Sequence, residues 1–195
     1  MRKSEIKRKT KETDIELVLK LDSAEESSVS TGIGFFDHMI HSFMKHGRMS
    51  VNLTCRGDLQ VDDHHTVEDV GICLGLAFNE ALGDKKGIRR FGFASVPMDE
   101  SLCQVSADLS GRPFFVMKGD MPAGYIKDYN NEMTNEFWYA FATNAKINLH
   151  INILYGDNSH HINEAVYKAA GAALHSAFTI DSAVKDVIPS TKGVI

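Results

Sequence analysis

Two five-residue motifs in this chain combine residue types that bind metal ions. Residues 64–68 and 160–164 each read His-His-x-x-Glu, and each begins an apolar segment with helical spacing. On a helix, residues four positions apart share a face, so the first histidine of each motif lies over its glutamate. Adjacent imidazoles diverge by about a third of a turn, so two neighbouring histidines suit two different ions better than one. Imidazole with carboxylate is a ligand set for zinc, iron or manganese, and carboxylate-rich sites favour the harder metals.

The spacing of the motifs indicates a duplicated domain. The second motif begins 160 − 64 = 96 positions after the first, close to half of the 195 residues. At the same offset Leu53 corresponds to Leu149 and Gly75 corresponds to Gly171. Each half would then supply part of a metal site.

The elements predicted around the motifs repeat in the same order. In the first half we expect two strands within residues 4–21, a short strand or loop at 27–34, a helix from 35 ended by Gly47, a strand at 50–55 and a helix at 64–82 whose N-cap is Asp62 or Asp63. In the second half we expect strands at 91–97, 102–109 and 113–117, a helix at 134–145, a strand at 146–154 and a helix at 158–178. The predicted fold class is therefore α+β, with two βββαβα halves, each a mixed sheet with two helices packed on one face. The halves span residues 1–90 and 91–187, and a tail without periodicity, 188–195, is either a frayed end or a loop that orders over an anion.

Composition excludes several classes of protein. The chain is 43% hydrophobic and 24% charged, which is ordinary for a globular protein, and no apolar run approaches the length that spans a bilayer. The basic N-terminus lacks the apolar segment of a secretory signal. Three widely spaced cysteines fit reduced thiols in a cytoplasmic protein, and a net charge of −5 argues against nucleic acid as a partner.

Further candidate residues lie outside the two motifs. His38, His41 and His46 share one predicted helix, and spacing alone leaves open whether they are ligands or surface residues. Arginine and lysine side chains suited to a phosphate monoester occur at Arg89, Arg90, Arg112, Lys168 and Lys192. The chain has neither a P-loop nor a GxGxxG motif, so a bound nucleotide is not indicated.

These motifs together resemble one family, the imidazoleglycerol-phosphate dehydratases of histidine biosynthesis. The similar segments are Phe36–Met39, Asp62–Thr66, Asp108–Pro113 and the second pentad with Lys168, and the resemblance extends over nearly the whole chain. It implies a metal-dependent hydro-lyase that converts imidazole glycerol phosphate to imidazole acetol phosphate.

The resemblance also implies a cofactor and an assembly. Family members bind two Mn²⁺ ions per active site, between subunits of a hollow homo-oligomeric shell of twenty-four chains. The ligand positions correspond here to His38, His64, His65, Glu68, Glu136, His160, His161 and Glu164. Many members carry a histidine at the position of Glu136, and a carboxylate there can still coordinate manganese.

Substrate contacts follow from the same resemblance. They correspond to Glu12, His46, Arg90, Arg112, Lys168, Ser190 and Lys192, with the basic and tail residues on the phosphate. The proton lost in the dehydration has no neighbouring carbonyl to acidify it, so the metal-bound imidazole ring must provide the driving force. We expect Glu12 to be the base because it carries no metal in the family pattern, and Glu164 is the second candidate.

Two other functions are compatible with the motifs alone. A dinuclear metallohydrolase would use a metal-bound hydroxide and release phosphate or an amine. A metal-storage or metal-structured assembly would show no turnover and would not need Glu12.

Overall fold

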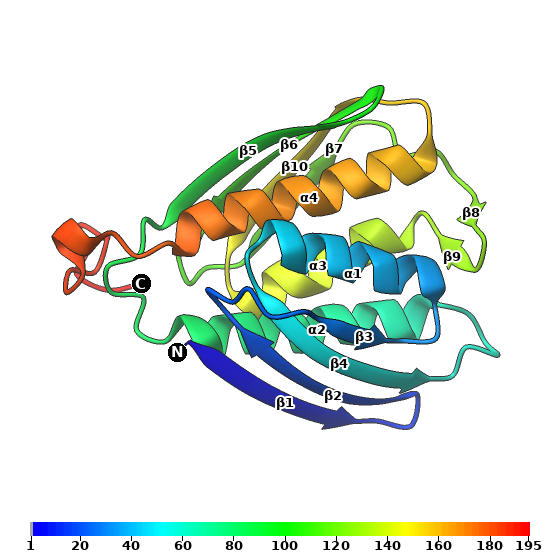
Figure 1. The fold of residues 1–195 in the computed structure, drawn as a ribbon, viewed down its shortest axis with the longest axis horizontal. Coiled ribbons are helices and arrows are strands. Elements are labelled where there is room, and N and C mark those ends of the chain that lie inside the picture. Colours follow the sequence, from blue (N-terminus) through cyan, green and yellow to red (C-terminus); the bar gives the residue numbers. More distant parts are fainter. Residues whose placement is uncertain (1) are drawn as a thin grey trace.

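The four long helices of this protein lie between two sheets. A computed structural model describes residues 2–195, and in it the two four-stranded sheets form the outer layers with the helices packed between them (Figure 1). Across these residues, no helix combines the length and apolar composition that a membrane crossing requires.

The first half follows the predicted βββαβα order. Its elements are β1 (Lys3–Lys9), β2 (Thr13–Lys20), β3 (Ser28–Ser30), α1 (Gly34–His46), β4 (Ser50–Gly57) and α2 (His64–Leu82). The sheet has the order β1-β2-β4-β3, with β3 parallel to β4 and the other pairs antiparallel. The segment that could have been a strand or a loop is therefore a short strand.

The second half repeats this topology with one insertion. Its elements are β5 (Phe91–Met98), β6 (Ser101–Asp108), β7 (Phe114–Lys118), β8 (Tyr125–Ile126), β9 (Tyr129–Asn130), α3 (Met133–Ala145), β10 (Asn148–Tyr155), α4 (Ser159–Phe178) and a 3-10 turn, η1 (Ser182–Val184). The sheet order is β5-β6-β10-β7, with β7 parallel to β10. The predicted α+β class with mixed sheets is confirmed.

Alternation along the strands explains why each sheet is covered on one face. In β2, Ile15, Leu17 and Leu19 are buried and point toward the helices, whereas β1 presents lysines and Glu5 outward. α2 packs on β1, β2 and β4, and α4 packs on β5, β6 and β10. Burial of such large aliphatic side chains contributes about 1.5–3 kcal/mol each relative to exposure.

The two halves meet through their helices, an arrangement that the sequence pattern did not predict. α2 packs against α3 and α1 against α4. Glycines permit this approach: a Cβ on Gly171 would lie 2.6 Å from the carbonyl oxygen of Phe43, and one on Gly75 would lie 2.5 Å from that of Phe141. The two glycines matched at the 96-residue offset thus make matching contacts.

The structure adds detail to two expected helix ends. Gly47 follows α1 as expected, with φ −79°, and the left-handed residue at this end is Arg48 with φ 48°. A Cβ at position 47 would lie 3.0 Å from the backbone carbonyl oxygen of Phe43, so this end of the helix is tightly packed. At the start of α2, the carboxylate of Asp62 accepts from the backbone N–H of His64, whereas Asp63 accepts from that of Asn130.

Replacing either matched glycine should destabilise the protein. We expect Gly171→Ala and Gly75→Ala each to lower the free energy of unfolding by about 1–3 kcal/mol, because the new methyl group would collide with helix backbone. Gly34→Ala is the control, since nothing lies within 4 Å of a Cβ there. Urea denaturation followed by circular dichroism measures all three. Wild-type stability in both Gly171→Ala and Gly75→Ala would show that the helices can separate without cost.

Candidate active site

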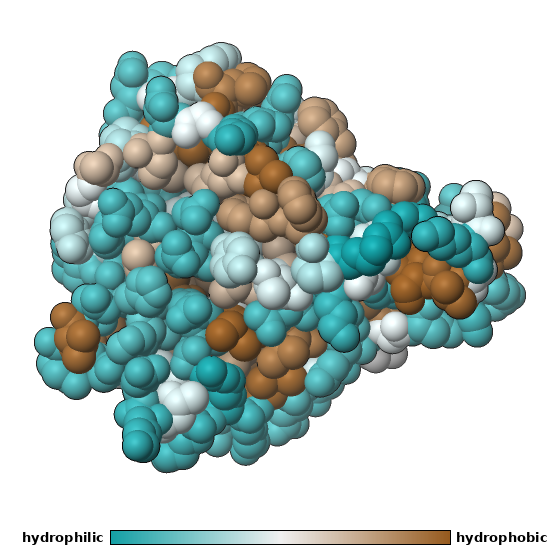
Figure 2. Space-filling view, turned by 180° about the vertical axis from the view of Figure 1, so that it is seen from behind, coloured by the Kyte–Doolittle hydropathy of each residue, from teal (hydrophilic) through white to brown (hydrophobic). Residues whose placement is uncertain are grey.

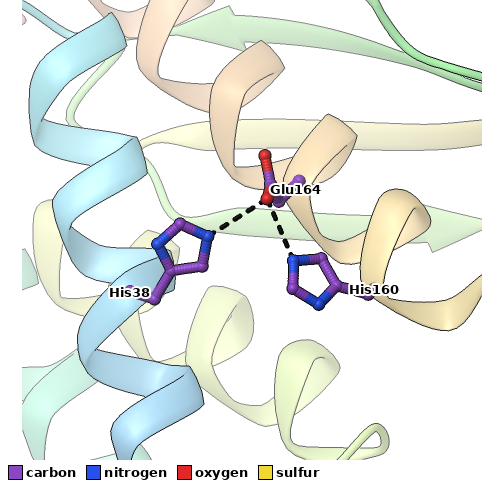
Figure 3. Close-up of side chains that lie close together, drawn as sticks. All are labelled: His38, His160 and Glu164. Carbon is purple, nitrogen blue, oxygen red and sulfur yellow. Dashed lines mark hydrogen bonds and ion pairs between the residues drawn. The ribbon is translucent and has the colours of Figure 1, made fainter.

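The packing of α1 against α4 brings three candidate ligands together. His38 comes from α1, while His160 and Glu164 lie one turn apart on α4 (Figure 3). Oε1 of Glu164 lies 3.1 Å from Nε2 of His38 and 3.0 Å from Nε2 of His160. One possible ligand atom from each residue falls within 4.8 Å of the others. Two imidazole nitrogens and a carboxylate oxygen at this spacing fit a divalent cation.

Glu164 remains an anion in this setting. Burial raises the pKa of its carboxyl, but the bonds from Lys168, His38 and His160 outweigh burial and lower the pKa to about 2. Nζ of Lys168 pairs with Oε2, so the ion pair occupies the oxygen that the histidines leave free. The carboxylate of Glu164 is therefore charged and already held in place by hydrogen bonds in this structure.

A cavity of about 1140 Å³ adjoins this group. Its lining includes His38, His46, Glu164 and Lys168, so two predicted substrate contacts share it with two predicted ligands. Burial, followed by the charge of Lys168, lowers the pKa of His46. His41, whose role was left open, also lines the cavity but does not join the three-residue group.

Neighbouring histidines point in different directions, as expected. The ring centroids of His160 and His161 are 6.2 Å apart with planes at 77°, and those of His64 and His65 are 6.2 Å apart at 83°. The near-identical ring geometry shows that the two motifs orient their histidine pairs alike. Each motif thus presents its two rings to two different positions.

The second histidine of each motif is bonded to a carboxylate that sequence reasoning missed. Nδ1 of His65 lies 3.1 Å from Oδ2 of Asp58, and Nδ1 of His161 lies 2.7 Å from Oε2 of Glu100. These hydrogen bonds raise the pKa of both imidazoles. Neither carboxylate belongs to a motif, and only the folded chain brings them to the rings.

The remaining candidate ligands are not gathered within one chain. Nε2 of His64 lies 3.9 Å from Oε2 of Glu68, and in residues 2–195 no third ligand joins them. Glu136 lines a separate cavity of about 400 Å³ beside Met117 and Met121. The structure of a single chain therefore assembles three of the eight predicted ligands.

The other predicted substrate contacts divide into two places. The carboxylate of Glu12 lies 3.7 Å from Nε2 of His65, on the turn between β1 and β2. Arg90 is held by Asp108 and donates to the carbonyl oxygen of Pro189, which anchors the tail. Arg112, Ser190 and Lys192 lie with this second group, where a Cβ on Gly111 would approach Ile195 to 3.1 Å.

The Arg90 group lies far along α4 from the group of His38, His160 and Glu164. The backbone N–H of Arg90 donates to the carbonyl oxygen of Ala177, which is 177 − 164 = 13 residues beyond Glu164 on the same helix. A rise of 1.5 Å per residue makes this separation about 20 Å. In Figure 1, α4 runs from its motif at the right toward the tail at the left.

The fold and this site define a class: a duplicated α+β protein with an imidazole–carboxylate group of the kind that binds a divalent cation. Comparisons with known proteins identify the family. The family model for imidazoleglycerol-phosphate dehydratase matches residues 31–174. Curated imidazoleglycerol-phosphate dehydratases from Bacillus subtilis and Thermoanaerobacter pseudethanolicus are 51% and 52% identical over 195 residues, covering all of each chain.

Solved structures agree with the sequence comparison. The imidazoleglycerol-phosphate dehydratase from Staphylococcus aureus superimposes with a TM-score of 0.84 at 34% identity, covering 92% of this chain and 99% of that one. The enzyme from Pyrococcus furiosus gives 0.82 at 32% identity, covering 97% of this chain and 100% of that one. The chain belongs to the imidazoleglycerol-phosphate dehydratase family. The predicted activity, that of a metal-dependent hydro-lyase in histidine biosynthesis, is confirmed.

The depressed pKa of Glu164 predicts a pH dependence of stability. In protein kept free of divalent cations, Glu164→Gln should lower the free energy of unfolding at neutral pH, because the charged carboxylate interacts favourably only in the folded state. The stability difference from wild type should shrink as pH falls from the ordinary 4.5 toward about 2, where the carboxyl becomes protonated in both states. Urea titrations of both proteins across this range measure it. A difference that stays constant down to pH 2 would contradict the assigned ion pairs.

Proposed function

We propose that this chain dehydrates imidazole glycerol phosphate at a site built around two Mn²⁺ ions. The observation that carries this proposal is the group of His38, His160 and Glu164, which opens onto the same cavity as Lys168 and His46. The ligand atoms suit a divalent cation, and the neighbouring lysine and histidine suit a polar, anionic substrate.

The ligand set proposed for the two cations comprises His38, His64, His65, Glu68, Glu136, His160, His161 and Glu164. Bound cations would withdraw electron density from the imidazole ring of the substrate and so favour loss of the adjacent hydroxyl group. The diverging rings within each motif support two cation positions rather than one.

The internal symmetry of the fold supports Glu136 as the eighth ligand. The matched glycines place Phe43 of α1 and Phe141 of α3 in equivalent positions, an offset of 141 − 43 = 98. The same offset takes His38 to Glu136. Glu136 therefore occupies on α3 the position that His38 occupies on α1, and carboxylate oxygen is a ligand that manganese accepts.

Glu12 is the proposed base. Its side chain is 52% exposed, and its carboxylate lies 3.7 Å from Nε2 of His65, the ring nitrogen proposed to bind the cation, so a substrate bound there would lie next to it. Glu164 is the weaker candidate, because its bonds to Lys168, His38 and His160 hold its pKa near 2 and make it a poor proton acceptor.

The phosphate of the substrate is proposed to bind Arg90, Arg112, Lys168, Ser190 and Lys192, with the tail at 188–195 forming part of the site. Imidazole glycerol phosphate is about 10 Å long, judged from ordinary bond lengths. It cannot span the roughly 20 Å between Glu164 and Arg90 on one chain. The tail and Arg90 of one chain would therefore complete a site whose ligands come from another, with residues 1–90 and 91–187 as the two ligand-bearing halves.

The outer face of the second sheet supports assembly into an oligomer. Phe91 and Phe93 on β5 are 62% and 58% exposed, and Phe114 on β7 is 62% exposed. Figure 2 shows apolar residues interrupting the hydrophilic surface on the side opposite to that of Figure 1. An exposed apolar face of this kind is typical of a protein–protein interface. We propose that other copies of this chain bury it, in the twenty-four-subunit shell of the family. A cytoplasmic location is also proposed, supported by three buried, free cysteines.

Replacing the proposed base should separate chemistry from cation binding. Glu12→Gln should bind Mn²⁺ as tightly as wild type while turnover falls by a factor of about 10²–10⁴. The assay measures formation of the enolisable ketone product. Chelation should abolish this activity in the wild type, and added Mn²⁺ should restore it in the wild type but not in Glu12→Gln. Near-normal turnover in Glu12→Gln would remove it from the mechanism, and phosphate release would indicate a hydrolase instead.

Mixing two inactive variants tests whether the site is shared. Glu164→Gln and Arg90→Ala should each be inactive alone, because one lacks a ligand and the other lacks a phosphate contact. If one site draws these residues from two chains, unfolding and refolding a 1:1 mixture should restore about a quarter of the sites. Each variant refolded alone is the control. A mixture as inactive as its parents would show that both residues serve the substrate from the same chain.

A further inference from the structure

We propose that Asp58 and Glu100 are positioning residues, each holding the second histidine of its motif by Nδ1 so that Nε2 faces the cation. The inference rests on the proposed function, because it takes His65 and His161 as ligands. It assigns a role to two carboxylates that lie outside both motifs.

The contacts of Asp58 support this role. Both of its oxygens lie close to Nδ1 of His65, at 3.2 and 3.1 Å. A neutral imidazole carries one N–H, and a carboxylate at Nδ1 keeps the proton there. The lone pair of Nε2 is then free to bind a metal ion, which is how a carboxylate commonly orients a histidine ligand.

Glu100 makes the equivalent contact from a firmly held position. Its Oε2 lies 2.7 Å from Nδ1 of His161, while Oε1 accepts from the backbone N–H of Asn158 at 2.9 Å and from the hydroxyl of Ser101 at 3.0 Å. Asn158 is the N-cap of α4. One side chain therefore ties the ring to the first turn of the helix that carries the motif.

The two carboxylates do not correspond under the duplication. Asp58 follows β4, and the 96-residue offset would take it to Leu154, which is 45% exposed. Glu100 instead lies in the turn between β5 and β6. Incidental pairing of surface charges would not be expected to reproduce the same Nδ1 contact from two unrelated positions. The shared feature is the orientation of the ring.

Asp58 also links His65 to the proposed base. Its backbone N–H donates to the carbonyl oxygen of Glu12 at 3.1 Å, while its carboxylate holds the ring that faces Glu12. The same turn is also held from α2, because the hydroxyl of Thr13, the residue after Glu12, donates to Asp69 at 2.5 Å. Asp58 thus holds a ligand and the turn that carries the base in one arrangement.

Cation affinity tests the proposal without relying on turnover. In the assembled protein, Asp58→Asn and Glu100→Gln should each weaken Mn²⁺ binding by roughly 10- to 100-fold, because an amide can donate to Nδ1 and allow the other tautomer. Asp58→Asn keeps the backbone bond to Glu12, so it changes the ring contact alone. Free Mn²⁺ measured by electron paramagnetic resonance gives the affinity.

The control separates positioning from loss of folding. Glu16→Gln removes an equal charge from a 62% exposed side chain paired with Lys7, and it should bind Mn²⁺ as wild type does. All three variants should unfold in urea with a cooperative transition when chelator is present, which shows that each is folded under the conditions of the binding measurement. Wild-type affinity in both Asp58→Asn and Glu100→Gln would overturn the inference. Failure of the wild type itself to bind Mn²⁺ would instead overturn the proposed function.

Discussion

The close approach of helices from opposite halves is the constraint on which the site depends. His38 can meet Glu164 only because α1 lies against α4, and that contact requires a residue without Cβ at position 171. Helix axes normally lie 8–10 Å apart, with the smaller values at small side chains. The glycine contact therefore sets the distance between the candidate ligand atoms of α1 and those of α4. The equivalent contact at Gly75 fixes α2 against α3 in the same way.

Charge then decides what this geometry can do. Glu164 is only 8% exposed, and an isolated buried carboxylate would tend to become neutral. Lys168, His38 and His160 keep it charged, and the same residues line or adjoin the cavity proposed for the substrate. A cation that took the place of the hydrogen bonds between Glu164 and the two histidines would bind a carboxylate that is already ionised and correctly oriented. Little reorganisation would therefore be needed on binding.

Sequence patterns predicted the elements well and their assembly less well. Alternation in residues such as Ile15, Leu17 and Leu19 marks β2, because one face of that strand is buried. The repeated His-His-x-x-Glu motifs indicated the duplication, and in the structure the two motifs begin helices and have the same ring geometry. The packing of α1 on α4 was not predictable from periodicity, which shows that a helix has a buried face but not which helix covers it.

The two positioning residues, Asp58 and Glu100, could not be predicted from sequence patterns. Glu100 lies in a hairpin turn and Asp58 after a strand, where acidic residues are common for reasons of turn formation alone. Their contacts to His161 and His65 depend on tertiary structure, and the duplication gives no help because the two positions do not correspond. The two motifs lie on equivalent helices, whereas the carboxylates that contact their second histidines come from different loops. Ring orientation is thus maintained where the sequence around it is not, as expected if the direction of Nε2 is what the site requires.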